Sequence, residues 1–189
     1  TKEHHFHKPD DRGGNCMDCH MPETTYMVVD PRRDHSIRIP RPDLSKKIGS
    51  PNACNQCHQD KNLQWSVDFV TKWYGEDFLN RSHFGEVFHQ ARSGHPQSAT
   101  KLINIIQNDS IPNIVKATAL SILGFFQGDQ VTEIFRGALS DKDPLIRMNA
   151  VSSLNFLNVQ NRFAIARHLL EDPVKSVRLR ATYTLSETP

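Results

Sequence analysis

Two short runs with identical spacing of cysteine and histidine constrain this chain more than any other feature. The first comprises Cys16, Cys19 and His20, and the second Cys54, Cys57 and His58. Each reads Cys-x-x-Cys-His, the attachment signal for c-type haem. In that linkage the two thiols form thioethers with the haem vinyl groups, and the adjoining histidine ligates the iron. The sequence therefore predicts two covalently bound haem c groups.

Two other chemistries use paired cysteines. A structural zinc ion would take both pairs, but the 34 residues between Cys19 and Cys54 exceed the roughly 15–20 of zinc ribbons. A redox dithiol needs one pair in a strand–helix context, which the proline-rich surroundings do not offer. We therefore favour covalent haem over zinc or free thiols.

The composition around the motifs supports the same interpretation. Residues 1–62 hold only 16 hydrophobic residues, four of them the cysteines, and six of the eleven prolines. Such a segment is too poor in apolar side chains to build an ordinary core, so we expect a loop-rich module in which the haems serve as the core. Because haem is attached in this way outside the cytoplasmic membrane, we expect a periplasmic or extracellular protein. The net charge of +2 gives no support for nucleic-acid binding, and no apolar run reaches the length of a spanning helix.

Each iron needs a second axial ligand, and the nearby histidines are the candidates. His7 and His35 are the preferred choices, with His5 as the substitute for His7; the others are His4, His83, His89 and His95. Two histidines per iron leave no position for a substrate, and histidine in place of methionine lowers the potential. This combination predicts an electron carrier and not an enzyme. The basic segment between the motifs is either a solvated loop or a source of arginines that pair with haem propionates.

Three stretches around the motifs carry a family resemblance. They are Cys-Met-Asp-Cys-His-Met-Pro (16–22), Tyr-Met-Val-Val-Asp-Pro-Arg-Arg-Asp-His-Ser-Ile-Arg-Ile-Pro-Arg-Pro-Asp-Leu (26–44) and Pro-Asn-Ala-Cys-Asn-Gln-Cys-His (51–58). Residues 4–75 thus resemble the multihaem cytochrome c family, closest to members that join such a module to HEAT or tetratricopeptide repeats. The resemblance implies His20 and His58 as proximal ligands and His7 and His35 as distal ones. The motif order is also similar to the last two haems of pentahaem nitrite reductases, but this sequence lacks their catalytic haem and its lysine ligand motif.

The second half of the chain is repetitive. A pattern of an apolar residue, a basic residue, an alanine and a leucine begins at Val115, at Ile146 and at Val177, each 31 residues after the last. A period of this size with two helical patterns per unit is typical of an α-solenoid. The alanine would let neighbouring helices approach closely, and the basic residue could bond the turn carbonyls or the aspartates of an adjacent repeat. This resembles HEAT repeats, although those are usually about 40–47 residues long.

The predicted fold is therefore mainly α, with three parts. Residues 1–62 form the dihaem cytochrome c module, residues 63–95 form bridging helices (at 60–74 and 82–92), and residues 96–189 form three HEAT-like repeats. The third repeat has no polar capping helix, so we expect further chain or another subunit to cover that end.

The predicted function is electron transfer to other cytochromes or redox proteins, with the repeats as a docking or assembly domain. The alternatives are a subunit or fragment of a multihaem oxidoreductase, similar to the nitrite reductases, and a self-assembling subunit of an extracellular cytochrome filament.

Overall fold

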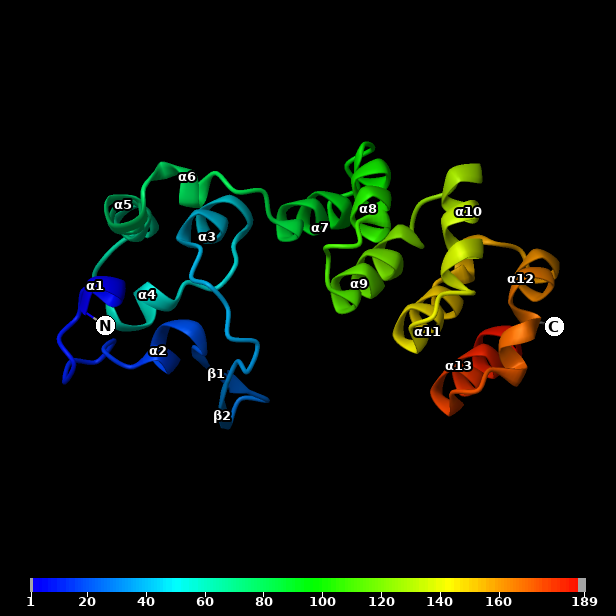
Figure 1. The fold of residues 1–189 in the computed structure, drawn as a ribbon, viewed down its shortest axis with the longest axis horizontal. Helices are drawn as coiled ribbons and strands as arrows, with labels where there is room; N and C mark the ends of the chain where they lie inside the picture. Colours follow the sequence, from blue (N-terminus) through cyan, green and yellow to red (C-terminus); the bar gives the residue numbers. More distant parts are fainter. Residues whose placement is uncertain (1, 187–189) are drawn as a thin grey trace. The chain divides into compact units, whose positions relative to one another are not determined.

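The computed structural model describes residues 2–186, which form two compact units divided between Ser82 and His83. Figure 1 labels the helices and strands of both units. The boundary lies inside the segment 63–95 that was predicted to be a bridge. The first helix of that segment packs in the first unit and the second helix packs in the second unit.

The first unit consists of short elements joined by loops. They are α1 (Lys2–His5), α2 (Cys16–His20), β1 (Glu23–Tyr26), β2 (Asp30–Arg33), α3 (Pro42–Ile48), α4 (Ala53–Cys57), α5 (Leu63–Tyr74) and α6 (Glu76–Leu79). The strands form an antiparallel hairpin in which Glu23 pairs with Arg33 and Tyr26 with Asp30. This hairpin was not predicted from the sequence.

Asparagine caps begin three of these helices. The side chains of Asn15, Asn52 and Asn62 each accept a hydrogen bond from a backbone N–H in the first turn of α2, α4 and α5. Such caps satisfy amide groups that have no partner inside a helix. Because α2 and α4 have only five residues each, they depend on these caps and on tertiary contacts.

The first unit buries few apolar side chains of its own. Among its described residues, the buried hydrophobic ones are Leu44, Val70 and Leu79. A charged contact supports α3 instead, since Arg41 donates two hydrogen bonds to the carboxylate of Asp43, at 2.7 and 2.8 Å, and one to the carbonyl oxygen of Leu79 at 3.1 Å. This unit therefore has the apolar deficit that the composition indicated.

The second unit is a stack of helix pairs. Its helices are α7 (Phe84–Arg92), α8 (Ser98–Gln107), α9 (Asn113–Leu123), α10 (Asp129–Ala138), α11 (Pro144–Ser152), α12 (Val159–Ala166) and α13 (Lys175–Ser186), with 3-10 turns at Leu154–Phe156 and Arg167–Glu171. α9, α11 and α13 are the second helices of successive pairs, and each contacts the next. α7 packs on α8 and α9, so the second predicted bridging helix belongs to the solenoid.

The core of the second unit is built from the repeat pattern. Ala119, Ala150 and Ala181 are fully buried, as expected for small residues where adjacent helices meet. The basic residue of the second repeat also behaves as predicted: Arg147 donates to both carboxylate oxygens of Asp172 in the next turn, at 2.6 and 2.9 Å, and to the carbonyl oxygen of Asp141 at 2.8 Å. The alanine position is buried in all three repeats, whereas the bidentate contact with an aspartate of the next repeat is made by Arg147.

Candidate functional site

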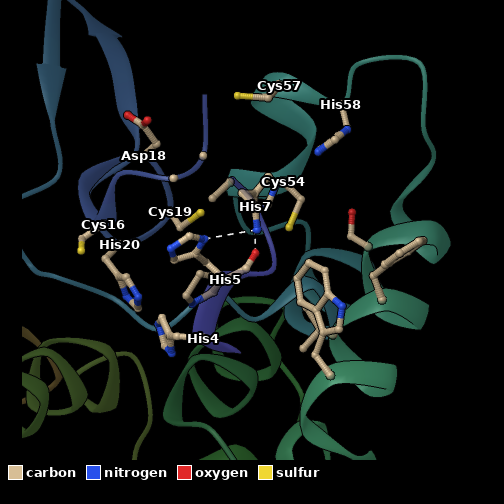
Figure 2. Close-up of a pocket in the computed structure, with 18 of the residues that line it drawn as sticks. His4, His5, His7, Cys16, Asp18, Cys19, His20, Cys54, Cys57 and His58 are labelled. Atoms are coloured by element: carbon tan, nitrogen blue, oxygen red, sulfur yellow. Dashed lines mark hydrogen bonds between the residues drawn. The ribbon is translucent and has the colours of Figure 1, made fainter. Parts of the chain in front are cut away.

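A cavity of about 330 Å³ lies in the first unit, and Figure 2 shows 18 of the residues that line it. Its lining includes the cysteines and histidines of both motifs, namely Cys16, Cys19, His20, Cys54, Cys57 and His58, together with His4, His5 and His7. The structure thus brings two motifs that are far apart in the sequence to one cavity. A volume of this size is in the range of ligand-binding sites.

Each motif helix carries one half-buried and one exposed cysteine: Cys19 and Cys54 are half-buried, and Cys16 and Cys57 are exposed. α2 and α4 contact each other, and within each helix the two cysteines are three residues apart, which places both thiols on one helix face. α4 is also bound to α5 through a buried polar cluster. In it, Asn52 donates to the Asn55 side-chain oxygen at 2.8 Å and to the Ser66 hydroxyl at 3.2 Å, and Ser66 donates to the same oxygen of Asn55 at 3.1 Å.

Histidine rings lie in pairs across the cavity. The ring centroids of His4 and His20 are 5.8 Å apart, with an angle of 12° between their planes. Those of His7 and His58 are 6.2 Å apart, with an angle of 38°. Two imidazoles that bind one metal ion from opposite sides, each at about 2 Å, have centroids roughly 6 Å apart. Both separations are compatible with two imidazoles on one metal ion, as is the 6.1 Å between the neighbouring rings of His5 and His7.

Hydrogen bonds determine which ring nitrogen is available in two of these histidines. Nδ1 of His20 lies 2.8 Å from the carbonyl oxygen of Arg38, and Nδ1 of His7 lies 2.6 Å from that of His5. Because a carbonyl oxygen only accepts, each Nδ1 must carry the proton, which leaves Nε2 with a lone pair. Metal-binding histidines commonly have this arrangement.

His5 has the opposite arrangement. Its Nδ1 accepts a hydrogen bond from the backbone N–H of His7 at 3.2 Å, so its proton lies on Nε2. Although His5 lines the cavity, the nitrogen that would ligate iron is the protonated one. His5 is therefore a weaker candidate than its neighbours His4 and His7.

Aromatic side chains of α5 form one wall of the cavity. Trp65 lies against the ring of His58, with centroids 4.6 Å apart, and Phe69 and Trp73 continue the row along the helix. Phe6 stacks on Trp73 at 4.7 Å and 15°, so the loop that carries His7 is held against the same helix. The wall is apolar and flat-sided, which suits a planar aromatic ligand.

The environment of the thiols argues against a redox dithiol. Burial raises the pKa of Cys19, and nearby Cys54 and Asp18 raise it further. Burial also raises the pKa of Cys54, although a hydrogen bond with Ser66 partly opposes it. Redox-active Cys-x-x-Cys pairs have a lowered thiol pKa, which is opposite to the direction at Cys19 and Cys54.

The donor set fits haem better than zinc. Within the described part of the chain, no three side chains of histidine, cysteine, aspartate or glutamate converge as a bound metal ion would require. Haem needs only two axial histidines per iron, two thiols per macrocycle and an apolar wall. The cavity lining contains two cysteine pairs, two histidine pairs and one aromatic wall, that of α5.

His35 and the arginines between the motifs are not part of the cavity lining. His35 is exposed in the turn after β2 and is not among the residues that line the cavity. The arginines between the motifs pair with aspartates, in the ion pairs Arg32–Asp30, Arg33–Asp18, Arg38–Asp34 and Arg41–Asp43, and the arginine that lines the cavity is Arg12. His4 was a candidate but not a preferred one; its signal was its place in the His-His-x-His run of residues 4–7.

Comparisons with known proteins identify the second unit. Residues 93–186 match the family model for HEAT repeats, which confirms the repeat prediction; the match begins three residues before the predicted start at 96, at the first residue after α7. Neither curated proteins nor solved structures gave a match. None of the helices in residues 2–186 has the length and apolarity needed to cross a membrane.

Proposed function

We propose that the first unit binds two haem c groups and that the protein carries electrons. Cys16 and Cys19 would hold one haem, and Cys54 and Cys57 the other. Each thiol adds across a vinyl group, so that a carbon–sulfur bond forms at one vinyl carbon and the thiol hydrogen moves to the other. When bound, each haem supplies an iron centre that gains or loses one electron. The observation that carries the proposal is the meeting of both Cys-x-x-Cys-His motifs at one cavity with histidine rings paired across it.

The histidines would fill both axial positions of each iron. His20 and His58 follow the cysteines directly and are the proximal ligands. We assign His4 opposite His20 and His7 opposite His58, because their ring separations of 5.8 and 6.2 Å fit one metal ion between each pair. This assignment keeps His7 and replaces His35 with His4.

Filled axial positions favour electron transfer over catalysis. With no open position at the iron, a substrate has no place to bind, and the protein groups around the metal need little rearrangement when the redox state changes. The HEAT repeats would supply a surface for docking other cytochromes or redox proteins. A periplasmic or extracellular location follows from where haem c is attached.

Expression with the haem c attachment machinery in a bacterial periplasm tests the proposal. The expected product has the mass of the chain plus two haems, a low-spin electron paramagnetic resonance spectrum, and no carbon monoxide binding when reduced. Replacing Cys16 and Cys19 with serine should remove one haem, and replacing Cys54 and Cys57 should remove the other. A product with no covalent haem would refute the proposal.

The axial assignment has its own test. His4→Ala and His7→Ala should each convert one of the two haems to a high-spin form, whereas His35→Ala, as the matched control, should leave the spectrum unchanged. If His35→Ala gives the high-spin signal and His4→Ala does not, the assignment of His4 is wrong while the haem proposal stands.

A further inference from the structure

Arg12 is a charged residue of the cavity lining that has no partner in the described chain. Apart from histidines, the lining contains one basic and one acidic side chain, Arg12 and Asp18. Asp18 accepts a hydrogen bond from Arg33 at 3.1 Å, so its charge is compensated. In the part of the chain that the structure describes, no hydrogen bond or ion pair engages the guanidinium of Arg12, and the two aspartates just before it, Asp10 and Asp11, do not pair with it. The lining therefore carries one uncompensated positive charge.

The turn that carries Arg12 has a closely packed backbone. The backbone N–H of Gly14 donates to the carbonyl oxygen of Asp11 at 2.9 Å. A Cβ at Gly14 would lie 2.5 Å from a backbone carbonyl oxygen of the same turn, so only glycine lets the chain fold back this closely. A Cβ at Gly13 would lie 3.2 Å from Nε2 of His7. The residue next to Arg12 is thus packed against a histidine that we assign as an axial ligand.

The chemistry of Arg12 selects a carboxylate. A guanidinium pairs with a carboxylate through two parallel hydrogen bonds, and each haem carries two propionates, which are carboxylates ionised near neutral pH. The four arginines between the motifs already pair with aspartates of the chain, whereas Arg12 does not. Arg12 lines the cavity and is also exposed, so it lies at the edge of the cavity, where the charged groups of a ligand can stay hydrated.

We infer that Arg12 binds a propionate carboxylate of one of the two haems. Because this inference rests on the proposed function, the contact forms only when haem is bound. The arginine–propionate contact that was expected between the motifs is then made by the turn before the first motif. The positive charge of Arg12 favours the ferrous state of the nearby iron, because ferrous haem carries one positive charge fewer than ferric haem. Arg12 would thus raise the potential of one haem without ligating its iron.

Arg12→Gln in the full haem-loaded chain tests the inference. Mass spectrometry establishes that both haems are attached, and electron paramagnetic resonance establishes that both stay low-spin. Redox titration followed by visible absorption then measures the two potentials. Resonance Raman spectroscopy records the bending band of the propionates, which responds to their hydrogen bonds. Lys8→Gln is the matched control, because Lys8 belongs to the same turn and has the same charge but does not line the cavity.

The expected result is a change at one haem. Arg12→Gln should lower one potential, so that the ratio of reduced to oxidised haem at a fixed applied potential falls about three-fold or more. The propionate band should shift as well. Arg12→Lys should recover most of the ratio, because the charge is kept, but less of the band position, because an ammonium group does not form the bidentate contact. Lys8→Gln should leave the band unchanged and alter the ratio less.

Three results with both haems attached would overturn the inference while the haem proposal stands. Unchanged potentials and an unchanged propionate band would identify Arg12 as a solvated residue. An equal fall in potential from Lys8→Gln, without a band shift from Arg12→Gln, would assign the effect to net charge instead of a contact. A high-spin signal from Arg12→Gln would mean that the side chain holds the turn beside His7. If the parent chain carries no covalent haem, the proposed function itself fails, and this inference fails with it.

Discussion

The ion pair between Arg147 and Asp172 should be the strongest single polar contribution to the stability of the HEAT repeats. It is bidentate, with distances of 2.6 and 2.9 Å, and the two side chains are only 11% and 3% exposed. Removing one partner of a buried pair commonly costs about 3–5 kcal/mol, because the other charge is left without compensation. Both side chains here keep some other contacts, which lowers the expected cost.

Those remaining contacts determine which of the two substitutions should lower the free energy of unfolding more. With Asp172→Asn, Arg147 still bonds to two carbonyl oxygens of its own turn, so we expect a loss of about 2 kcal/mol. With Arg147→Met, the carboxylate of Asp172 keeps the hydrogen bond from the backbone N–H of Val174 and the attraction of Arg178, so we expect about 3 kcal/mol. The double variant should cost about 2 kcal/mol less than the sum of the two single losses, since the shared interaction can be lost only once.

Urea unfolding followed by far-ultraviolet circular dichroism measures these losses. Both tryptophans, Trp65 and Trp73, lie in the first unit, so tryptophan fluorescence reports on that unit separately and should not change. Single losses that add up to the double loss to within about 0.5 kcal/mol would refute the pairing argument.

The pH dependence follows from the same contact. Hydrogen bonds from Arg147 hold the pKa of Asp172 below its ordinary value, more than burial raises it. A carboxyl group with a lowered pKa in the folded state stabilises the fold above its unfolded pKa of about 3.9, and this stability is lost as the pH falls through the folded value. The difference between the parent chain and Asp172→Asn should thus be full at neutral pH and should close in acid.

Three further predictions concern other contacts. Gly13→Ala should displace His7 and give a high-spin signal from one haem, because a Cβ would lie 3.1 Å from the His7 ring at a φ of +99°; Gly49→Ala, at φ +72° with open space around it, is the control. Ser66→Val should lower the free energy of unfolding of the first unit by about 1–3 kcal/mol, as measured by tryptophan fluorescence. The change removes the buried hydroxyl that bonds to the side chains of Asn52, the cap of α4, and Asn55 within α4. Ala150→Leu should destabilise the repeats in circular dichroism by about 1–3 kcal/mol or more, because that position is 0% exposed between packed helices. An unchanged haem spectrum would contradict the prediction for Gly13→Ala, and an unchanged free energy of unfolding would contradict the predictions for Ser66→Val and Ala150→Leu.

The sequence predicted the repeats well because their determinants are local and recur. Each unit uses the same positions for its apolar contacts, its small residue and its basic residue, so the 31-residue period is visible without knowledge of the fold. The role of Arg147 could be anticipated because its partner, Asp172, occupies a repeated place in the next turn. The helix α5 was also expected from the sequence. That it belongs to the first unit was not, because this follows from its packing against α3 and α4, which the local sequence pattern does not reveal.

The histidine pairing could not be read from the sequence. His4, His5, His7 and His35 are chemically identical, and their positions depend on the path of the chain. Between His5 and His7 the chain turns at Phe6, which has a φ of +55° and stacks on Trp73, 67 residues away in sequence. The hairpin was missed for a similar reason. Its turn places Met27 and Val28 at φ +48° and +73°, and such residues give no turn signal because side chains disfavour that region.

The two units differ in what their cores permit during evolution. In the repeats, every buried side chain packs against other side chains of the chain, so a change at one position can be compensated by a change at its neighbour. In the first unit, the residues around the cavity face one another across space that the chain does not fill. If a rigid cofactor fills that space, a change in one lining residue cannot be compensated by a change in its neighbour, because the shape of the cofactor does not vary with the protein sequence. Substitutions around the cavity should then be accepted far more rarely than equally buried substitutions in the repeats.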